Sequence, residues 1–296
     1  MPEVTPISSR KSDHLRINKS EDVDSGLSTG LEQYRFIHRA LPELDLDQTD
    51  TYVNIFGKQL RAPILISSMT GGTEEAAAIN QLLAEAAQIT GIAMGLGSQR
   101  AAIDHPELAI TYQVRQFAPD CLLFANLGAI QLNYNYGVDQ CLRAIDMTQA
   151  DALILHFNPL QEAVQPGGDT HFSGLAHKLS TVCRSLPVPV IAKEVGWGFS
   201  KPDILLLQDC GIAAIDVAGA GGTSWSQVEM YRAEDESQAQ LAAGPPDHRS
   251  HLYQNLAAAA AALPAARCPP AKLAGERGNP RSPGSHSSCS SRVTEV

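Results

Sequence analysis

The stretch Ala152-Leu-Ile-Leu-His-Phe-Asn-Pro-Leu-Gln-Glu162 indicates the fold class, because an apolar run ends abruptly in polar side chains. Those polar residues are His156, Asn158, Gln161 and Glu162. Five other runs change in the same way, from apolar to polar, hydroxyl-rich or Gly-rich, beginning at Ala62, Gly91, Cys121, Pro189 and Ile212. Parallel β/α enzymes show this layout because their ligand site lies at the carboxyl ends of the strands. The sequence therefore predicts six buried strands that share one site.

Helix-like segments separate these runs. The expected helices are Glu74–Thr90, Pro106–Phe117, Gly137–Thr148, Ser173–Leu186 and Lys201–Cys210, with a shorter one at Gly30–Ala40. Thr70 or Thr73 suits the N-cap of the first of these, since acidic residues follow. Each β/α unit is about 30 residues long, as a βαβ crossover requires.

Two architectures bury strands that are apolar on both faces: an open doubly wound sheet and a closed barrel. A dinucleotide-binding sheet places GxGxxG after its first strand, whereas this chain has Ser67-Ser-Met-Thr-Gly-Gly72 there. Polar residues also follow all six runs. We therefore favour an α/β fold of the (β/α)8 TIM-barrel type, of which six units are recognisable.

The chain divides into three parts by composition. Residues 1–60 are polar and charged, and residues 61–243 carry the β/α rhythm. Residues 244–296 are rich in Pro, Ala and Ser, have no periodic apolar face, and are expected to be disordered. A natural tail and an altered end, frameshifted or truncated, are the two interpretations of this last part. We favour the altered end, in which two β/α units have been replaced.

The bulk properties of the 296-residue chain exclude several classes of protein. A net charge of −10 argues against a broad nucleic-acid surface, and no apolar stretch has the length of a membrane span. The cysteines show no metal-type spacing and suit a reducing, cytoplasmic location: Cys121, Cys141, Cys183, Cys210, Cys268 and Cys289.

Several motifs together resemble the type 2 isopentenyl-diphosphate delta-isomerases. The matching passages are Arg10-Lys-Ser-Asp-His14, Arg35-Phe-Ile-His-Arg-Ala-Leu-Pro-Glu43, Ser67-Ser-Met-Thr-Gly-Gly72, Gly97-Ser-Gln-Arg100, His156-Phe-Asn-Pro-Leu-Gln-Glu162, Ala192-Lys-Glu-Val-Gly196 and Ala218-Gly-Ala-Gly-Gly-Thr-Ser-Trp225. The resemblance covers about residues 8–243. It implies a (β/α)8 barrel that uses FMN, NADPH and Mg²⁺ to convert isopentenyl diphosphate to dimethylallyl diphosphate. A homo-oligomer, up to an octamer, is also implied if the barrel is complete.

The resemblance also assigns substrate-side residues. Arg10, Lys11, Ser98, Gln99, Arg100 and Asn158 would bind the diphosphate, and Glu162 would bind the metal. Gln161, His156 and Glu229 would serve catalysis, with Gln161 also touching the substrate. Paired cations and a forked guanidinium suit a diphosphate independently of the resemblance. The structural alternatives are solvated terminal charges at Arg10 and Lys11, a surface ion pair at Arg100 and a core histidine at His156.

The flavin contacts carried over are Ser68, Met69, Thr70, Ser98, Asn126, Lys193 and Thr223. Lys193 interrupts an apolar strand, so it needs a charge partner or a shifted pKa. Reduced flavin provides such a partner, and an inward ion pair with Glu194 or another acid is the alternative. Asn126 could simply form a turn, and the loop before Trp225 could be a Gly-rich connector.

Other functions remain open on the sequence alone. One is a different FMN barrel enzyme, such as a 2-hydroxy-acid oxidase, and another is an inactive fragment of the isomerase. The late GGIR-like phosphate segment of the family is not found in this chain, which puts flavin-phosphate binding and barrel closure in doubt. An open barrel would expose strand edges, so poor solubility is expected.

Overall fold

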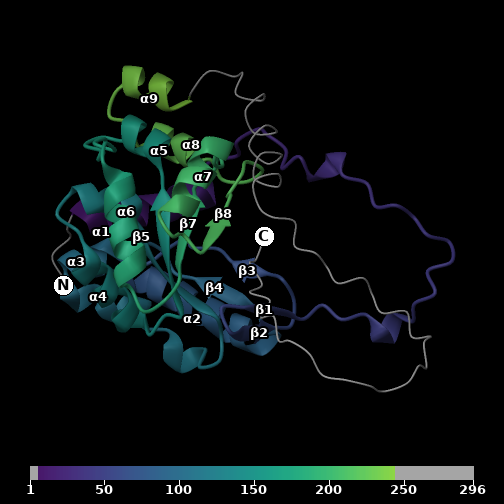
Figure 1. Ribbon diagram of the computed structural model, residues 1–296. Coiled ribbons are helices and arrows are strands. Elements are labelled where there is room, and N and C mark those ends of the chain that lie inside the picture. The colour runs from purple at the N-terminus through teal and green to yellow at the C-terminus, as the bar shows by residue number, and fades with distance from the viewer. Residues whose placement is uncertain (1–5, 244–296) are drawn as a thin grey trace.

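The structure, a computed structural model, describes the backbone of residues 6–243 and the side chains from Arg10 onward. Its centre is a six-stranded parallel sheet (Figure 1). The strands are β3 (Leu65–Ile66), β4 (Ala93–Gly95), β5 (Leu123–Gly128), β6 (Ala152–Phe157), β7 (Val190–Glu194) and β8 (Ala214–Asp216). All six predicted strands are therefore confirmed. The tail predicted at 244–296 lies outside the described residues.

The strand order separates the two architectures left open by the sequence. Neighbouring strands in the sheet follow chain order, β3-β4-β5-β6-β7-β8, and every pairing is parallel. A doubly wound sheet reverses its order at a switch point, and no reversal occurs among the described strands. The sequential order is the one that a β/α barrel uses.

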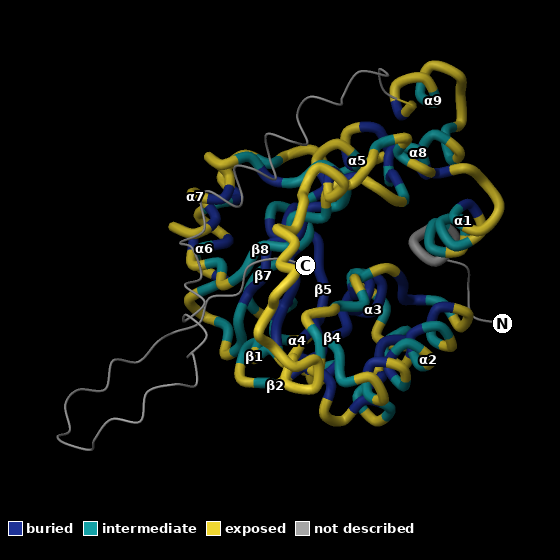
Figure 2. The backbone as a smooth tube through the Cα atoms, turned by 90° about the vertical axis from the view of Figure 1, so that its right-hand side faces the viewer, coloured by how far each residue is buried: buried dark blue, intermediate teal, exposed yellow. Residues whose placement is uncertain are grey.

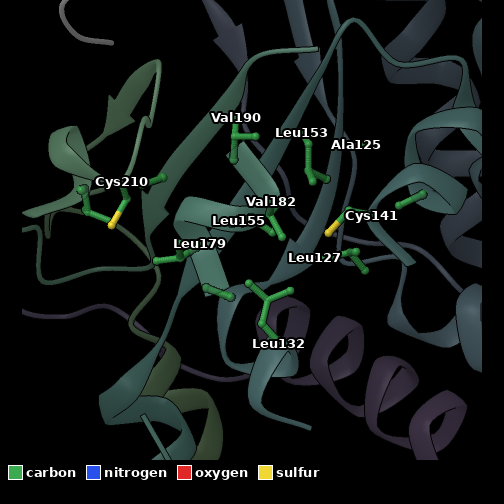
Figure 3. Packing of buried hydrophobic residues seen from close by; sticks show 14 of the residues in the cluster. Ala125, Leu127, Leu132, Cys141, Leu153, Leu155, Leu179, Val182, Val190 and Cys210 are labelled. Atoms are coloured by element: carbon green, nitrogen blue, oxygen red, sulfur yellow. The ribbon is translucent and has the colours of Figure 1, made fainter. Parts of the chain in front are cut away.

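Successive residues of the central strands point to opposite faces of the sheet. Leu153 and Leu155 of β6 pack outward into the cluster beneath the helices, together with Val190 of β7 (Figure 3). Ala152 and Ile154 pack inward instead. Both faces of β5, β6 and β7 are covered, so these strands are apolar except for the polar residues near their carboxyl ends. The outer strands β3 and β8 are only half-buried.

The inner face is closed at the amino ends of the strands by a short antiparallel hairpin. Its strands are β1 (Val53–Ile55) and β2 (Lys58–Leu60). Leu60 is 3% exposed and packs against Phe124 and Ile191 of the sheet. In two views at right angles the hairpin lies at one end of the sheet and α5 and α8 lie at the other (Figures 1 and 2).

Four predicted helices are confirmed within one or two residues. They are α2 (Glu74–Thr90), α4 (Val138–Thr148), α6 (Leu175–Ser185) and α7 (Lys201–Asp209). Thr73 is the N-cap of α2, where its hydroxyl accepts the Ala76 N–H at 3.1 Å. Three short helices each follow a strand: α3 (Arg100–Asp104) follows β4, α5 (Pro159–Val164) follows β6 and α8 (Trp225–Arg232) follows β8. The fourth, α9 (Glu236–Ala243), follows α8.

Two predicted helices are wrong. Pro106–Phe117 is not one α-helix but two 3₁₀ helices, Pro106–Tyr112 and Arg115–Phe117. Local bonds replace the helical ladder there: the Thr111 hydroxyl donates to the Leu108 carbonyl at 2.7 Å. Gly30–Ala40 contains a single 3₁₀ turn at Leu31–Gln33, and its large apolar side chains are exposed. A short isolated helix with nothing to pack against is not stable.

The N-terminal helix was not predicted. α1 (Pro6–Ser20) packs against α8 through Ile17, Val23 and Val228. A second contact joins the same regions, because Asp24 and Thr223 form an antiparallel bridge. These contacts bring α1 to the carboxyl ends of the strands (Figure 2). Within the described ranges, no helix is long and apolar enough to cross a membrane.

Candidate active site

A cleft opens at the carboxyl ends of the strands and encloses about 910 Å³, its open mouth included. The lining comes from α1, from the ends of β3 to β7 and from α5 and α8. Its charged residues are Arg10, Lys11, Arg100, Lys193 and Glu162.

These charges make the cleft locally cationic, although the whole chain carries −10. Four cationic side chains face a single carboxylate in the described lining. Low-dielectric walls strengthen such a field, so the cleft favours an anion with several charges. The alternative of solvated terminal charges at Arg10 and Lys11 does not fit, because both half-buried side chains line the cleft. Burial lowers the pKa of both, that of Lys11 to about 8.

A row of polar side chains crosses the inner face where the strands end. His156 of β6 is paired in register with Lys193 of β7, which is paired with Asp216 of β8. His156 Nδ1 lies 2.9 Å from the Asn126 side-chain oxygen, and an amide oxygen accepts, so this nitrogen donates. Burial, followed by the Lys193 charge, lowers the pKa of His156 to about 3. The imidazole is therefore neutral, and its Nε2 is an acceptor.

Lys193 does not form the ion pair with Glu194 that was the alternative. The Glu194 carboxylate accepts the backbone N–H groups of residues 195–198. Lys193 Nζ donates instead to the Glu194 carbonyl at 2.7 Å. Burial lowers the pKa of Lys193, and Asp216 opposes that shift only in part. A buried ammonium of this kind stabilises negative charge on a ligand at the inner face.

Helix α1 contributes Arg10, Lys11 and His14 to the cleft, from one face of the helix. His14 Nε2 lies 3.3 Å from the Glu229 carboxylate, and the His14 ring meets Trp225 edge to face with centroids 5.1 Å apart. These contacts fix the approach of α1. Because α1 lies outside the sheet, its cations are placed at the site by this packing.

The Glu162 side chain lies in α5 and is 6% exposed. Its Oε1 accepts Asn158 Nδ2 at 3.0 Å, and its Oε2 accepts the Asp169 N–H at 2.7 Å and the Gln165 side-chain amide. Asn158 Oδ1 is buried beside it with no hydrogen-bond partner. This pair offers two neighbouring oxygens, one of them uncommitted, which are the ligand type that Mg²⁺ takes.

Gln161 is held by two neighbours. Its Nε2 donates to Glu229 Oε1 at 2.9 Å, and its Oε1 accepts Asn158 Nδ2 at 3.1 Å. Glu229 is fully buried and also bonds Arg232 at 2.5 Å. Burial raises the pKa of Glu229, but the bonds from His14 and Gln161 outweigh it, so the pKa lies below its usual value. Glu229 is therefore an anion that orients the Gln161 amide from behind the cleft.

The part of the lining that follows β3 suits a flat ring. Ser68 and Met69 line it, and the Ser68 hydroxyl is buried without a hydrogen-bond partner. A Cβ on Gly95 would lie 2.3 Å from that hydroxyl, and one on Gly97 would lie 2.3 Å from the Thr70 carbonyl. These two glycines allow the backbone to pack closely around the uncommitted donor. Together with Asn126 and Lys193, this wall fits a flavin.

Besides Glu229, which lies behind the cleft, three predicted site residues do not line it. Gln99 is fully buried, and its side chain bonds the Ala144 carbonyl at 2.8 Å and the Asn126 N–H at 2.8 Å. Thr70 is 8% exposed, and its side chain is not part of the lining. Thr223 bonds Asn18 at 3.1 Å in the connection between α1 and α8. The substrate role predicted for Gln99 does not fit this geometry, because its whole amide is used in the scaffold.

Sequence reasoning missed three residues at the site as well. His14 was quoted only as part of a motif, and Gln131 and Gln165 were not considered, yet all three line the cleft. Gln165 follows Gln161 by four positions, which places both on one side of a helical turn. That spacing could have identified Gln165, whereas no local pattern identifies Gln131.

A pre-formed protein cage for a metal is not present among the residues that the structure describes, since no three His, Cys, Asp or Glu side chains cluster there. The described cysteines Cys121, Cys141, Cys183 and Cys210 are free thiols and do not line the cleft.

Comparisons with known proteins address the family directly. Isopentenyl-diphosphate delta-isomerase from Synechocystis sp. is 62% identical over 234 residues, which are 79% of this chain and 67% of that protein. The enzyme of the same name from Nostoc sp. is 58% identical over 234 residues, with the same coverage, and that from Rickettsia canadensis is 52% identical over 233 residues, covering 79% and 68%. No family model matches the chain.

Solved structures show weaker likeness. An (S)-mandelate dehydrogenase mutant has a TM-score of 0.48 at 17% identity, covering 76% of this chain and 75% of its own. A mandelate oxidase mutant has a TM-score of 0.47 at 16% identity, covering 74% and 72%. Likeness at this level does not bear on function. The sequence relatives do, and at 52–62% identity over 79% of its length the chain belongs to the isopentenyl-diphosphate delta-isomerase family.

Proposed function

We propose that this chain isomerises isopentenyl diphosphate to dimethylallyl diphosphate, with FMN and Mg²⁺ bound in the cleft and NADPH as the reductant of the flavin. The observation that carries the proposal is the cationic cleft, which Arg10 and Lys11 of α1, Arg100 of α3 and Lys193 of β7 line together with Glu162 of α5. The family is shown by sequence, and the roles below are inferred from geometry.

Arg10, Lys11 and Arg100 would bind the diphosphate. A guanidinium donates two parallel N–H groups to phosphate oxygens, and an ammonium supplies a point charge. Glu162 would hold Mg²⁺ together with Asn158 Oδ1, and the substrate oxygens would complete the coordination. Because Glu162 already accepts three hydrogen bonds, its carboxylate is fixed before any metal binds.

The reaction moves a double bond, so one carbon gains a proton and another loses one, without net oxidation. Reduced FMN, when bound, would supply the proton donor and acceptor. Lys193 would stabilise its negative charge, with Ser68, Met69, Ser98 and Asn126 along the same wall. Gln161, held in one orientation by Glu229, would face the substrate. Neutral His156 would accept a hydrogen bond from a metal-bound water or from the substrate.

The direct test is anaerobic incubation of the purified 296-residue chain with isopentenyl diphosphate, FMN, Mg²⁺ and NADPH, followed by product analysis. Dimethylallyl diphosphate is the expected product, and omission of Mg²⁺ should abolish it. A chain that retains flavin but forms no product would contradict the proposal. Flavin reduction by a 2-hydroxy acid would favour the oxidase alternative, and a chain that retains no flavin would be the inactive form.

The assembly of several chains and the domain boundaries at residues 60 and 243 remain part of the same proposal. Light scattering during gel filtration of the flavin-loaded chain tests the assembly. A single monomer peak would contradict the proposed homo-oligomer.

A further inference from the structure

Asp169 lies behind the cleft and contacts two of its charged residues through different atoms. Its carboxylate Oδ2 accepts Arg100 Nη1 at 2.8 Å, and its backbone N–H donates to Glu162 Oε2 at 2.7 Å. Gln131 Nε2 donates to the same Asp169 oxygen at 3.0 Å. Asp169 does not itself line the cleft, whereas Arg100, Gln131 and Glu162 do.

The turn that carries Asp169 is packed tightly onto the backbone of α5. Gly167 has a φ of +65°, and the Gly168 N–H donates to the Gln165 carbonyl at 3.3 Å. A Cβ on Gly168 would lie 1.9 Å from the Glu162 carbonyl oxygen. Only a residue without a side chain allows the turn to approach α5 this closely, and the close approach places the Asp169 N–H against the Glu162 carboxylate.

Arg100 depends on this turn for its orientation. The Arg100 side chain is 30% exposed, and its other acidic neighbour, Asp104 Oδ2, lies 3.8 Å from Nε. Arg100 Nε is buried and has no hydrogen-bond partner. The 2.8 Å bond to Asp169 is thus the short contact that holds the guanidinium, and it leaves donors for an anion in the cleft.

We propose that Asp169 is a positioning residue. It fixes the Arg100 guanidinium relative to the Glu162 carboxylate, so that the cation and the metal ligand can bind the same diphosphate. The inference rests on the proposed function. Arginine has many rotamers, and a side chain already held in its binding geometry loses less entropy when the ligand arrives. Asp169 acts through Arg100 and touches no reacting atom.

A purely electrostatic view of Asp169 makes the opposite prediction. Asp169 adds a negative charge near an anion site, so its removal by charge alone would tighten diphosphate binding. Positioning predicts weaker binding instead. The sign of the change therefore decides between the two views.

The experiment titrates the full chain with inorganic pyrophosphate and Mg²⁺ in a calorimeter. Asp169→Asn should weaken pyrophosphate binding about 10-fold, the effect of losing one charge-assisted hydrogen bond. Asp104→Asn is the matched control, because it also removes a carboxylate near Arg100 but no short contact to Arg100. The short hydrogen bond of Asp104 comes from the Tyr136 hydroxyl at 2.6 Å, and an amide oxygen can still accept it. The affinity of Asp104→Asn should stay unchanged or rise. Unchanged or tighter binding by Asp169→Asn, or an equal loss in both variants, overturns the inference.

Asp169→Glu keeps the charge and moves the carboxylate by one methylene. If Asp169 acts by positioning Arg100, this variant should also bind pyrophosphate more weakly. If it acts through charge alone, its affinity for pyrophosphate should not change. Asp169→Glu therefore distinguishes the two views even if Asp169→Asn does not fold. In a double-mutant cycle with Arg100→Lys, the losses of binding free energy in the two single variants should not add, because both substitutions disrupt the same Arg100–Asp169 contact.

Turnover provides a second readout. Asp169→Asn should raise KM for isopentenyl diphosphate about 10-fold with kcat nearly unchanged, as expected when binding is lost equally from substrate and transition state. An unchanged KM contradicts the inference. If the unaltered chain binds pyrophosphate and forms product while Asp169→Asn behaves identically, only this inference fails. If the unaltered chain neither binds pyrophosphate nor forms product, the proposed function fails as well.

Discussion

The two ends of the same sheet differ in chemistry. At the carboxyl ends lies a cleft with four cations and one carboxylate, and three of its polar atoms, Ser68 Oγ, Asn158 Oδ1 and Arg100 Nε, are buried without partners. At the amino ends, Leu60 of the β1–β2 hairpin packs against Phe124 and Ile191 of the sheet. One end keeps polar groups uncommitted, which costs stability, and the other buries apolar surface, which provides it. The difference shows that strand direction alone divides the molecule into a binding end and a stabilising end.

Replacing Glu162 by Gln should produce the largest effect at the binding end. Loss of the metal-binding charge is expected to lower isomerase activity by about 100- to 1,000-fold, the scale of several kcal/mol in transition-state stabilisation. The amide has the same shape, but its NH₂ cannot accept a hydrogen bond where a carboxylate oxygen did, so the free energy of unfolding should also fall by about 1–3 kcal/mol. Product formation and thermal melting are measured on one preparation. Full activity in this variant would remove Glu162 from the metal site.

Replacing Leu60 by Ala tests the stabilising end. Leu60 is 3% exposed, and truncation of a buried leucine costs about 2–5 kcal/mol. Urea unfolding should show that loss, while the kcat of the folded, flavin-loaded protein stays unchanged. A fall in kcat without a change in stability would mean that the two ends of the sheet are not independent.

Lys193→Met should show that one side chain favours flavin binding and lowers stability. Burial lowers the pKa of Lys193, so its charge costs stability, and an apolar side chain of similar length should leave the melting temperature equal or higher. Flavin retention after desalting should fall about 10-fold, because a charge-assisted contact is lost. Retention of flavin at the level of the unaltered chain would exclude Lys193 from the flavin site.

Lys11 should make substrate binding depend on pH. Its pKa is lowered to about 8, so the side chain is an ammonium below pH 8 and becomes neutral as the pH rises through that value. KM for isopentenyl diphosphate should therefore rise above pH 8, by up to about 10-fold for one lost charge-assisted contact. Lys11→Arg stays charged and should flatten the profile. The same rise in both proteins would assign the pH dependence to another group.

The sequence predicted the parts of the fold that follow from local pattern. The six apolar runs became six parallel strands, and Glu74–Thr90 was predicted to the residue. Asn126, His156 and Lys193 were placed at strand ends because polar residues directly follow or interrupt buried apolar ones. Periodicity and strand direction are sufficient for these assignments, since parallel strands end at one edge.

Prediction failed where tertiary packing sets the outcome. Gly30–Ala40 has helical spacing but no surface to cover, so it stays largely irregular. Gln99 stands beside Arg100 in the sequence, yet its side chain turns into the scaffold and bonds Ala144 and Asn126. Neighbours along the chain point in different directions, and only the packed structure shows which one reaches a ligand.

The sequence by itself determined that this chain is a parallel β/α protein of the isomerase family, with polar groups gathered at its strand ends, because hydrophobic period and motif order are local properties. Tertiary structure alone decided that α1 brings Arg10 and Lys11 across the whole chain to Glu162, that Glu229 holds Gln161 and that Asp169 holds Arg100. Gln161 and Glu229 are 68 residues apart in the sequence, and Arg100 and Asp169 are 69 residues apart. Arg10 and Lys11 lie further still from Glu162. Contacts of that range exist only after hydrophobic burial has brought the elements together.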